Sequence, residues 1–179
     1  MEYTEQWLPV TVSGYEAIYS VSDQGRVRRE AQSRGTSPGK ILKTNDNGAG
    51  YLYVGLRKNG EPAKRFAVHR LVLLAFVGLP KEGQEGCHNN GQRGDNRLCN
   101  VRWDSSKLNN ADKVKHGTSN RGERQGLATM VDDQVRCILI HLKKGNLTQP
   151  QIAAICGVPT YAVNNVKHGK SWKYFTLDQ

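Results

Sequence analysis

The sequence lacks any apolar run near the roughly 18 residues that a membrane-spanning helix requires, so we expect no membrane association. Its first ten residues, MEYTEQWLPV, do not form the apolar segment of a signal peptide, and we expect a cytosolic protein. Cysteine is scarce: four in 179 residues, none in a CxxC pair, which argues against a zinc ribbon or a thioredoxin-type site. In the cytosol we expect all four (Cys87, Cys99, Cys137 and Cys156) to be reduced.

Acidic residues are also under-represented. The chain has 16 Asp and Glu against 26 Lys and Arg, which gives a net charge of +10 and a pI near 9.6. Such an excess favours a polyanionic partner, and nucleic acid is the most common one.

The first 80 residues show strand patterns. The segments 15–21 and 26–28 flank a turn at Asp23–Gly25, and the segments 51–56 and 64–68 flank a second turn at residues 58–61. The period then changes, and Leu71 to Phe76 fit a short helix that Gly78 and Pro80 end. We therefore predict a β-rich N-terminal module, residues 1–80, within an α+β fold.

The last third is helical in pattern. Residues 118–127 are polar and Gly-rich and predict a linker. Residues 128–179 predict three helices that begin near Asp132, Thr148 and Thr160, in a helix–turn–helix arrangement whose last helix would read DNA. A small helical bundle without a ligand is the alternative. The side chains expected to contact DNA here are Tyr161, Asn164, Asn165, Lys167 and Lys170.

The middle segment, residues 81–117, is rich in chemically active side chains. It contains Cys87-His88-Asn89-Asn90-Gly91, then Asn100-Val101-Arg102-Trp103, then Asn109 six residues after the tryptophan. In this order the motifs resemble those of the HNH endonucleases of the His-Me finger (ββα-metal) group, most closely those of homing endonucleases of phages and introns. Residues 7–77 also resemble the NUMOD4-like module that often precedes such nucleases, through words such as Tyr19-Ser20-Val21-Ser22 and Val68-His69-Arg70-Leu71-Val72.

The resemblance implies a central ββα-metal nuclease core and a metal-dependent enzyme that hydrolyses or nicks duplex DNA in the cytoplasm of a bacterial host, encoded by a phage and acting as a monomer. His88 is the candidate general base, since imidazole takes a proton near neutral pH. We expect Asn100 to orient its ring, and Asn109 to offer a neutral oxygen to a divalent ion, Mg²⁺ before Mn²⁺ or Zn²⁺. In a helix, Asn109, Asp112 and His116 would share one face.

One residue departs from the family pattern. Position 87, where the family often has a metal-binding Asp, holds a cysteine, whose thiol is a poor ligand for Mg²⁺. Asp112 or another acid could replace the carboxylate, a softer metal could bind Cys87 and His116, or the site could be inactive. His116 could equally be a helix C-cap, and structural zinc on Cys87, Cys99 and His116 is a minor reading.

Other charged side chains complete the predicted DNA surface. Arg26, Arg28 and Arg65 lie on the predicted hairpins, and Arg102 lies in the predicted nuclease core. A basic two-stranded hairpin can fit the major groove of DNA, so these arginines are expected to contact DNA. The alternatives are a DNA-binding protein whose nuclease core has decayed and, less compatible with a helix–turn–helix, an RNA-binding or RNA-cleaving protein.

Overall fold

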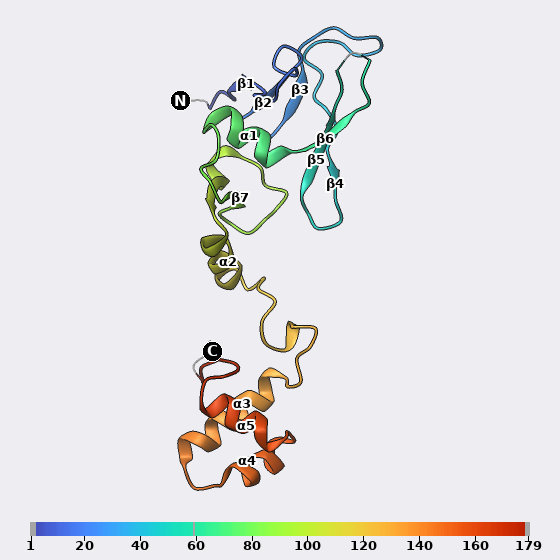
Figure 1. Ribbon diagram of the computed structural model, residues 1–179. Helices are drawn as coiled ribbons and strands as arrows, with labels where there is room; N and C mark the ends of the chain where they lie inside the picture. The colour runs from blue at the N-terminus through green and yellow to red at the C-terminus, as the bar shows by residue number, and fades with distance from the viewer. Residues whose placement is uncertain (1–2, 59, 178–179) are drawn as a thin grey trace. The chain divides into compact units, whose positions relative to one another are not determined.

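The computed structural model describes residues 3–58 and 60–177, and its fold is mixed α+β, as predicted (Figure 1). Its contacts divide the chain into two compact units, Met1–Ser119 and Asn120–Gln179. Residues on both sides of the predicted boundary at residue 80 belong to the first unit. The second unit begins within the predicted linker, where η2 (Gly122–Arg124) forms a short 3₁₀ turn.

Two small antiparallel sheets open the first unit. One has the order β1 (Trp7–Pro9), β2 (Tyr19–Ser22) and β3 (Val27–Arg29), and the other β4 (Asn45–Asp46), β5 (Leu52–Leu56) and β6 (Lys64–Ala67). The turn between β2 and β3 contains Gly25 at φ 75°, a backbone angle that favours glycine.

The predicted strand over residues 15–21 is mostly wrong, because the backbone turns through residues 13–18 and only β2 pairs with its neighbours. Tyr15 faces inward from this turn, and its ring meets that of Phe66 edge to face with 5.4 Å between centroids. Packing of the aromatic side chain therefore explains the apolar pattern that indicated a strand.

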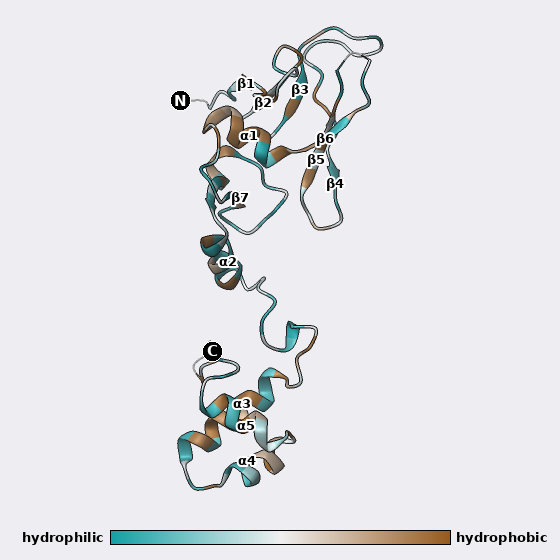
Figure 2. Ribbon diagram, in the orientation of Figure 1, coloured by the Kyte–Doolittle hydropathy of each residue, from teal (hydrophilic) through white to brown (hydrophobic). Residues whose placement is uncertain are grey.

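Helix α1 (Val68–Phe76) supplies the centre of the core in this unit. Its apolar face is brown in Figure 2 and packs against side chains from both sheets and from β8. The buried residues of this core include Val21, Val27, Val54, Leu56, Leu71, Val72, Leu73 and Val101. Removing these side chains from water is the main force that joins the N-terminal sheets to the nuclease-like segment.

A hairpin followed by a helix completes the first unit. Strands β7 (Gln84–His88) and β8 (Val101–Ser105) are antiparallel, with Cys87 opposite Arg102, and the short 3₁₀ turn η1 (Leu98–Asn100) precedes β8. Helix α2 (Ser106–Lys115) follows directly, and the Ser105 side chain accepts a hydrogen bond from the Leu108 amide as an N-cap. This ββα order is the one predicted for the central segment.

The second unit packs α3 (Asp132–Lys144), α4 (Gln149–Cys156) and α5 (Thr160–Lys167) around a separate core. Ile138, Ile152 and Val163 are buried at its centre. One expectation is overturned: Cys137 of α3 and Cys156 of α4 form a disulfide, because helix packing brings their Cα atoms to 6.0 Å. Cys87 and Cys99 are free thiols, as expected.

Across residues 3–58 and 60–177, no helix combines the length and the apolarity needed to cross a bilayer.

Candidate active site

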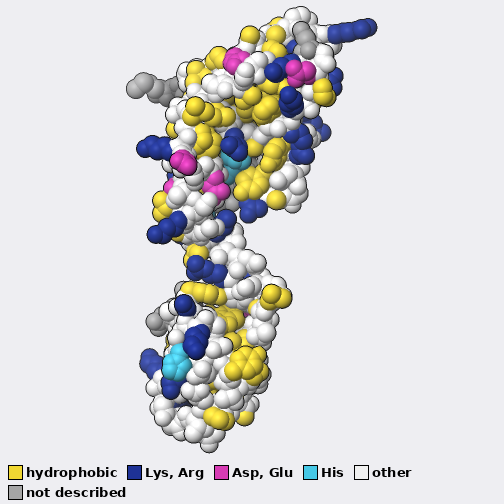
Figure 3. Space-filling view, in the orientation of Figure 1, with side chains coloured by type: hydrophobic (Ala, Val, Ile, Leu, Met, Phe, Trp, Pro, Cys, Tyr) yellow, Lys and Arg dark blue, Asp and Glu magenta, His cyan; other side chains and the backbone are white. Residues whose placement is uncertain are grey.

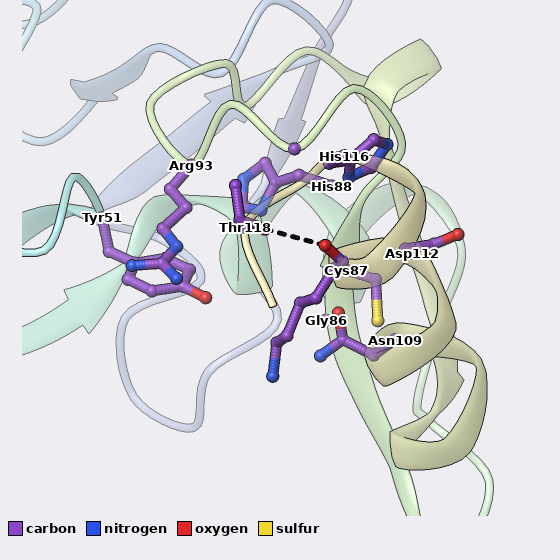
Figure 4. A pocket seen from close by; sticks show the side chains of 11 residues that line it. Tyr51, Gly86, Cys87, His88, Arg93, Asn109, Asp112, His116 and Thr118 are labelled. Carbon is purple, nitrogen blue, oxygen red and sulfur yellow. Dashed lines mark hydrogen bonds between the residues drawn. The ribbon is translucent and has the colours of Figure 1, made fainter. Parts of the chain in front are cut away.

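A small pocket of about 40 Å³ lies where β7, the loop after it and α2 meet (Figure 4). Five residues singled out from the sequence line it together: Cys87, His88, Asn109, Asp112 and His116. Tyr51, Arg93, Lys113 and Thr118 also line the pocket. Its volume suits an ion and a few water molecules but not a nucleoside, so a polymeric substrate would have to lie across its opening.

The His88 ring is buried and held in one orientation. Its Nε2 lies 3.1 Å from Oδ1 of Asn96, whose amide nitrogen donates to the Gly94 carbonyl at 3.3 Å. Because Oδ1 can only accept, Nε2 carries the hydrogen and Nδ1 keeps its lone pair. Burial lowers the pKa of His88, against the opposing effect of the Asn96 hydrogen bond, so the ring is neutral and able to accept a proton at pH 7.

The side chain that contacts the His88 ring is Asn96, not Asn100 as predicted. The Asn100 side chain accepts from the Asn90 amide at 3.1 Å and donates to the Asp95 carbonyl at 2.8 Å. Asn100 therefore ties together the two ends of the loop that carries Asn96. Spacing along the sequence alone does not show which amide reaches the imidazole, so Asn96 could not be chosen in advance.

The N-terminal sheet fixes the position of Asn96. A Cβ added to Gly25 would come within 2.8 Å of the Asn96 Cβ, so the β2–β3 turn lies directly against this residue. In the same contact the Leu98 amide donates to the Asp23 carbonyl at 2.8 Å. A turn more than 60 residues away in sequence therefore supports the side chain that orients His88.

His69 is a second imidazole beside the site. Its ring meets that of His88 edge to face, with 5.0 Å between the ring centroids. The centroid of the Tyr51 ring lies 5.6 Å from that of His69. Burial, helped by the nearby His88 and Arg70, lowers the pKa of His69 to about 4. Gly86 makes room for the ring, since a Cβ there would lie 2.7 Å from the His69 Cδ2.

Cys87 is not suited to hold a hard cation. Its side chain is buried, and burial raises the pKa of the thiol despite the nearby Arg102, so the sulfur stays protonated at neutral pH. Mg²⁺ prefers oxygen ligands, and a neutral thiol offers neither charge nor a hard donor.

Asp112 is also engaged elsewhere. Its carboxylate forms an ion pair with Arg102, which also binds Asp104, and the Arg102 hydrogen bond lowers the pKa of Asp112. In Figure 4 the Asp112 side chain extends away from His88. Asp112 therefore lines the pocket with a carboxylate that shares one guanidinium group, that of Arg102, with Asp104.

Asn109 has a carboxylate partner that the sequence did not single out. Its Nδ2 donates to Oε1 of Glu85 at 2.9 Å, and this hydrogen bond is the main reason that the pKa of Glu85 is lowered. Glu85 and Cys87 are two residues apart on β7 and so share a face of the hairpin. Only its alternation with Cys87 could have indicated Glu85 beforehand.

His116 is the helix C-cap weighed from the sequence, and its role as a metal ligand stays a prediction. Its backbone caps the C-terminus of α2, and its side chain lines the pocket against Gly91, where an added Cβ would lie 2.7 Å from the His116 Nδ1. Among the residues described, no group of three or more His, Cys, Asp or Glu side chains is arranged to hold a metal ion. An ion in this pocket would therefore depend on amide oxygens, one or two carboxylates and water.

The arginines predicted for DNA contact in the first unit have partners within the protein. Arg26 and Arg28 lie over the Trp7 ring, and their charges are balanced by Glu5 and Glu30. Arg65 lies over Tyr53, 4.9 Å from the ring centroid. Stacking on aromatic rings holds these guanidinium groups in fixed positions.

The predicted contacts of the second unit lie on and just after α5. Tyr161 is 60% exposed, Lys167 and Lys170 are exposed, and Asn164 and Asn165 are half-buried. On the face drawn in Figure 3, Lys and Arg side chains are more prominent than Asp and Glu on each unit. The positive charge predicted from composition is therefore presented to solvent.

Comparisons with known proteins agree with this geometry. The NUMOD4 motif matches residues 5–57. Over 117 residues, 65% of its length, the chain is 35% identical to the DNA endonuclease I-HmuI of Bacillus phage SP01. A solved structure described as "DNA binding and cleavage by the HNH homing endonuclease I-HmuI" matches with a TM-score of 0.56 and 26% identity, covering 92% of this chain and 90% of that one. By these comparisons the chain is similar to an HNH homing endonuclease.

A further HNH relative is less similar but spans more of the chain. An uncharacterized HNH endonuclease of Acanthamoeba polyphaga mimivirus is 29% identical across 98% of this chain. The chain spans 63% of the length of I-HmuI and 43% of the mimivirus protein. The resemblance recognised from the sequence is confirmed.

Proposed function

We propose that this protein is a metal-dependent endonuclease that hydrolyses phosphodiester bonds in duplex DNA. One observation carries the proposal: a buried, neutral imidazole at position 88 is fixed by Asn96 so that its lone-pair nitrogen is free, and it lines the same small pocket as the oxygen donor Asn109. The relationship to HNH homing endonucleases supports it independently.

The chain's own residues supply the acid–base part of the reaction. Nδ1 of His88 would take a proton from the attacking water, and Asn96 would stabilise the resulting imidazolium through Nε2. Arg93, which lies over Tyr51 at the pocket wall, is placed to contact a phosphate. His69 stays neutral and adds no positive charge beside the base.

The pocket residues fit a hard divalent ion better than a soft one. The oxygen donors are the Asn109 amide and nearby carboxylates, the Cys87 thiol is protonated, and His116 adds one imidazole to the lining. When bound, Mg²⁺ or Mn²⁺ would stabilise the charge that builds up on the phosphate and the leaving oxygen. Asn109 is the residue that would hold it.

Binding to the duplex would use both units. The arginines of the N-terminal sheets and the exposed residues of α5 would contact DNA. Because a chain with one active site cuts one strand at a time, a monomer would nick the duplex. We place this activity in the cytoplasm of a bacterial host.

A supercoiled-plasmid assay tests the proposal. With Mg²⁺ or Mn²⁺, the wild type should convert plasmid to relaxed circles, and His88→Ala should lower the rate by about 10²–10⁴-fold, the usual range for a general base. His168→Ala, which changes an exposed histidine of the second unit, is the matched control.

Three outcomes would contradict the proposal. Tight duplex binding without cleavage in either metal would instead identify a DNA-binding protein with an inactive nuclease core. Equal nicking by the wild type and His88→Ala would remove His88 from the reaction. Competition by structured RNA as effective as that by duplex DNA would contradict the proposed substrate.

A further inference from the structure

The residues that line the pocket offer no uncommitted carboxylate to a cation. Cys87 is a buried thiol, Asp112 shares Arg102 with Asp104, and Asn109 is a neutral amide. Divalent magnesium in proteins usually has at least one carboxylate among its ligands and keeps several waters. If the protein is a metal-dependent nuclease, another acid must serve this pocket.

Glu85 is not among the residues that line the pocket, but its carboxylate lies beside Asn109, which does line it. It is the carboxylate that the Asn109 amide contacts, and it comes from the strand that also presents Cys87 to the pocket. Glu85 is exposed, so an ion bound there could keep water ligands and also reach a phosphate at the surface.

The distance between the two side chains also fits. In an octahedral Mg²⁺ shell with ligands at about 2.1 Å, neighbouring ligands lie about 3 Å apart. The Glu85 Oε1 and the Asn109 Nδ2 are 2.9 Å apart. A half-turn of the amide would put Oδ1 where Nδ2 now lies, so that two oxygens at this separation could share one ion.

We propose that Glu85 and Asn109 together form the divalent-cation site of this protein, with the carboxylate supplied from position 85 rather than from position 87. This inference rests on the proposed nuclease function for its biological purpose, but the site itself is a statement about cation binding. The hydrogen bond seen between Glu85 and Asn109 is then the arrangement that an arriving ion replaces.

Manganese binding to the full-length protein tests the site without any measurement of cleavage. The electron paramagnetic resonance signal of free Mn²⁺ should fall as the wild type binds the ion, and added Mg²⁺ should restore it. Glu85→Gln should weaken Mn²⁺ affinity by about tenfold or more, since it removes the negative charge from the ligand pair. Glu82→Gln, the same change on a nearby exposed residue, should leave affinity unchanged.

Further variants separate the other candidates. Cys87→Ala should retain Mn²⁺ affinity, and Asp112→Asn should change it much less than Glu85→Gln does. The proposal is overturned if wild type binds no Mn²⁺, if Glu85→Gln binds as wild type does, or if Asp112→Asn alone abolishes binding. A lower melting temperature of Glu85→Gln with unchanged Mn²⁺ affinity would show that Glu85 only joins β7 to α2.

The two proposals fail separately. Glu85-dependent Mn²⁺ binding in a protein that never nicks plasmid would remove the nuclease and leave the cation site. Nicking by the wild type together with normal Mn²⁺ binding by Glu85→Gln would remove the cation site and leave the nuclease.

Discussion

In the first compact unit, the pocket side chains come from segments between Tyr51 and Thr118, whereas in the second the predicted DNA contacts fall within Tyr161–Lys170. The pocket depends on long-range contacts, such as that between Gly25 and Asn96. Helix α5 presents its exposed residues by local helical geometry once Val163 and Val166 are buried. Substitutions far from the pocket should therefore affect the first unit's function, while effects on α5 should stay local.

The largest effect that we expect from this difference is on stability and comes from His69. Its pKa is about 4 when folded and near 6.5 when unfolded, so below pH 6.5 only the unfolded state takes up the proton. The contribution of neutral His69 to the free energy of unfolding is therefore fully present above pH 6.5 and is lost as the pH falls toward 4. Between pH 7 and 4.5 the free energy of unfolding of the first unit should fall by about 2 kcal/mol from this group.

This prediction can be measured by denaturant unfolding in a Trp172→Phe background, in which the remaining tryptophans, Trp7 and Trp103, both report on the first unit. His69→Gln should reduce the pH dependence even if it lowers stability at pH 7. A pH dependence identical in His69→Gln and in the exposed control His168→Gln would show that His69 is not buried in its neutral form.

The next effect tests whether Asn96 positions His88. Asn96→Ala should lower the nicking rate by roughly 10- to 100-fold, the usual cost of losing a group that orients a functional histidine, with little change in DNA affinity. Because the Asn96 hydrogen bond raises the pKa of His88, its loss should also move the acidic limb of the pH–rate profile to lower pH.

A merely structural role for Asn96 would not shift that limb. Asn100→Ala is the comparison, since Asn100 holds the loop without contacting His88 in the hydrogen bonds seen here. If the acidic limb of the pH–rate profile shifts for Asn100→Ala and not for Asn96→Ala, then Asn100, as predicted from the sequence, orients His88 and Asn96 does not.

The smallest effects belong to α5. Replacing Lys167 and Lys170 by Ala should weaken binding to all duplexes roughly tenfold and reduce the slope of log affinity against log salt by about 2. Asn164→Ala or Asn165→Ala should instead change the preference among sequences, with nicking chemistry intact. Filter binding over a salt series, on several duplexes, measures both. Similar behaviour of the lysine and asparagine variants would exclude α5 as the recognition helix.

Local sequence was sufficient for some features and not for others. The spacing of Asn109, Asp112 and His116 predicted one helical face, and all three line the pocket. The disulfide between Cys137 and Cys156 was not foreseen, because it depends on how α3 packs against α4. Likewise, no sequence rule pairs Asp112 with Arg102 or Asn109 with Glu85.

Apolar periodicity in the sequence predicted the helices of the second unit, because periodic burial of apolar side chains is a local property. The order of strands and helix around His88 was predicted from the resemblance to HNH endonucleases. Only the tertiary structure decided which polar groups meet at the pocket: Asn96 rather than Asn100 at the imidazole, His69 behind it, and Glu85 beside Asn109. Hydrogen bonds need partners within about 3 Å, and in this loop-rich region that distance is set by long-range packing rather than by spacing along the chain.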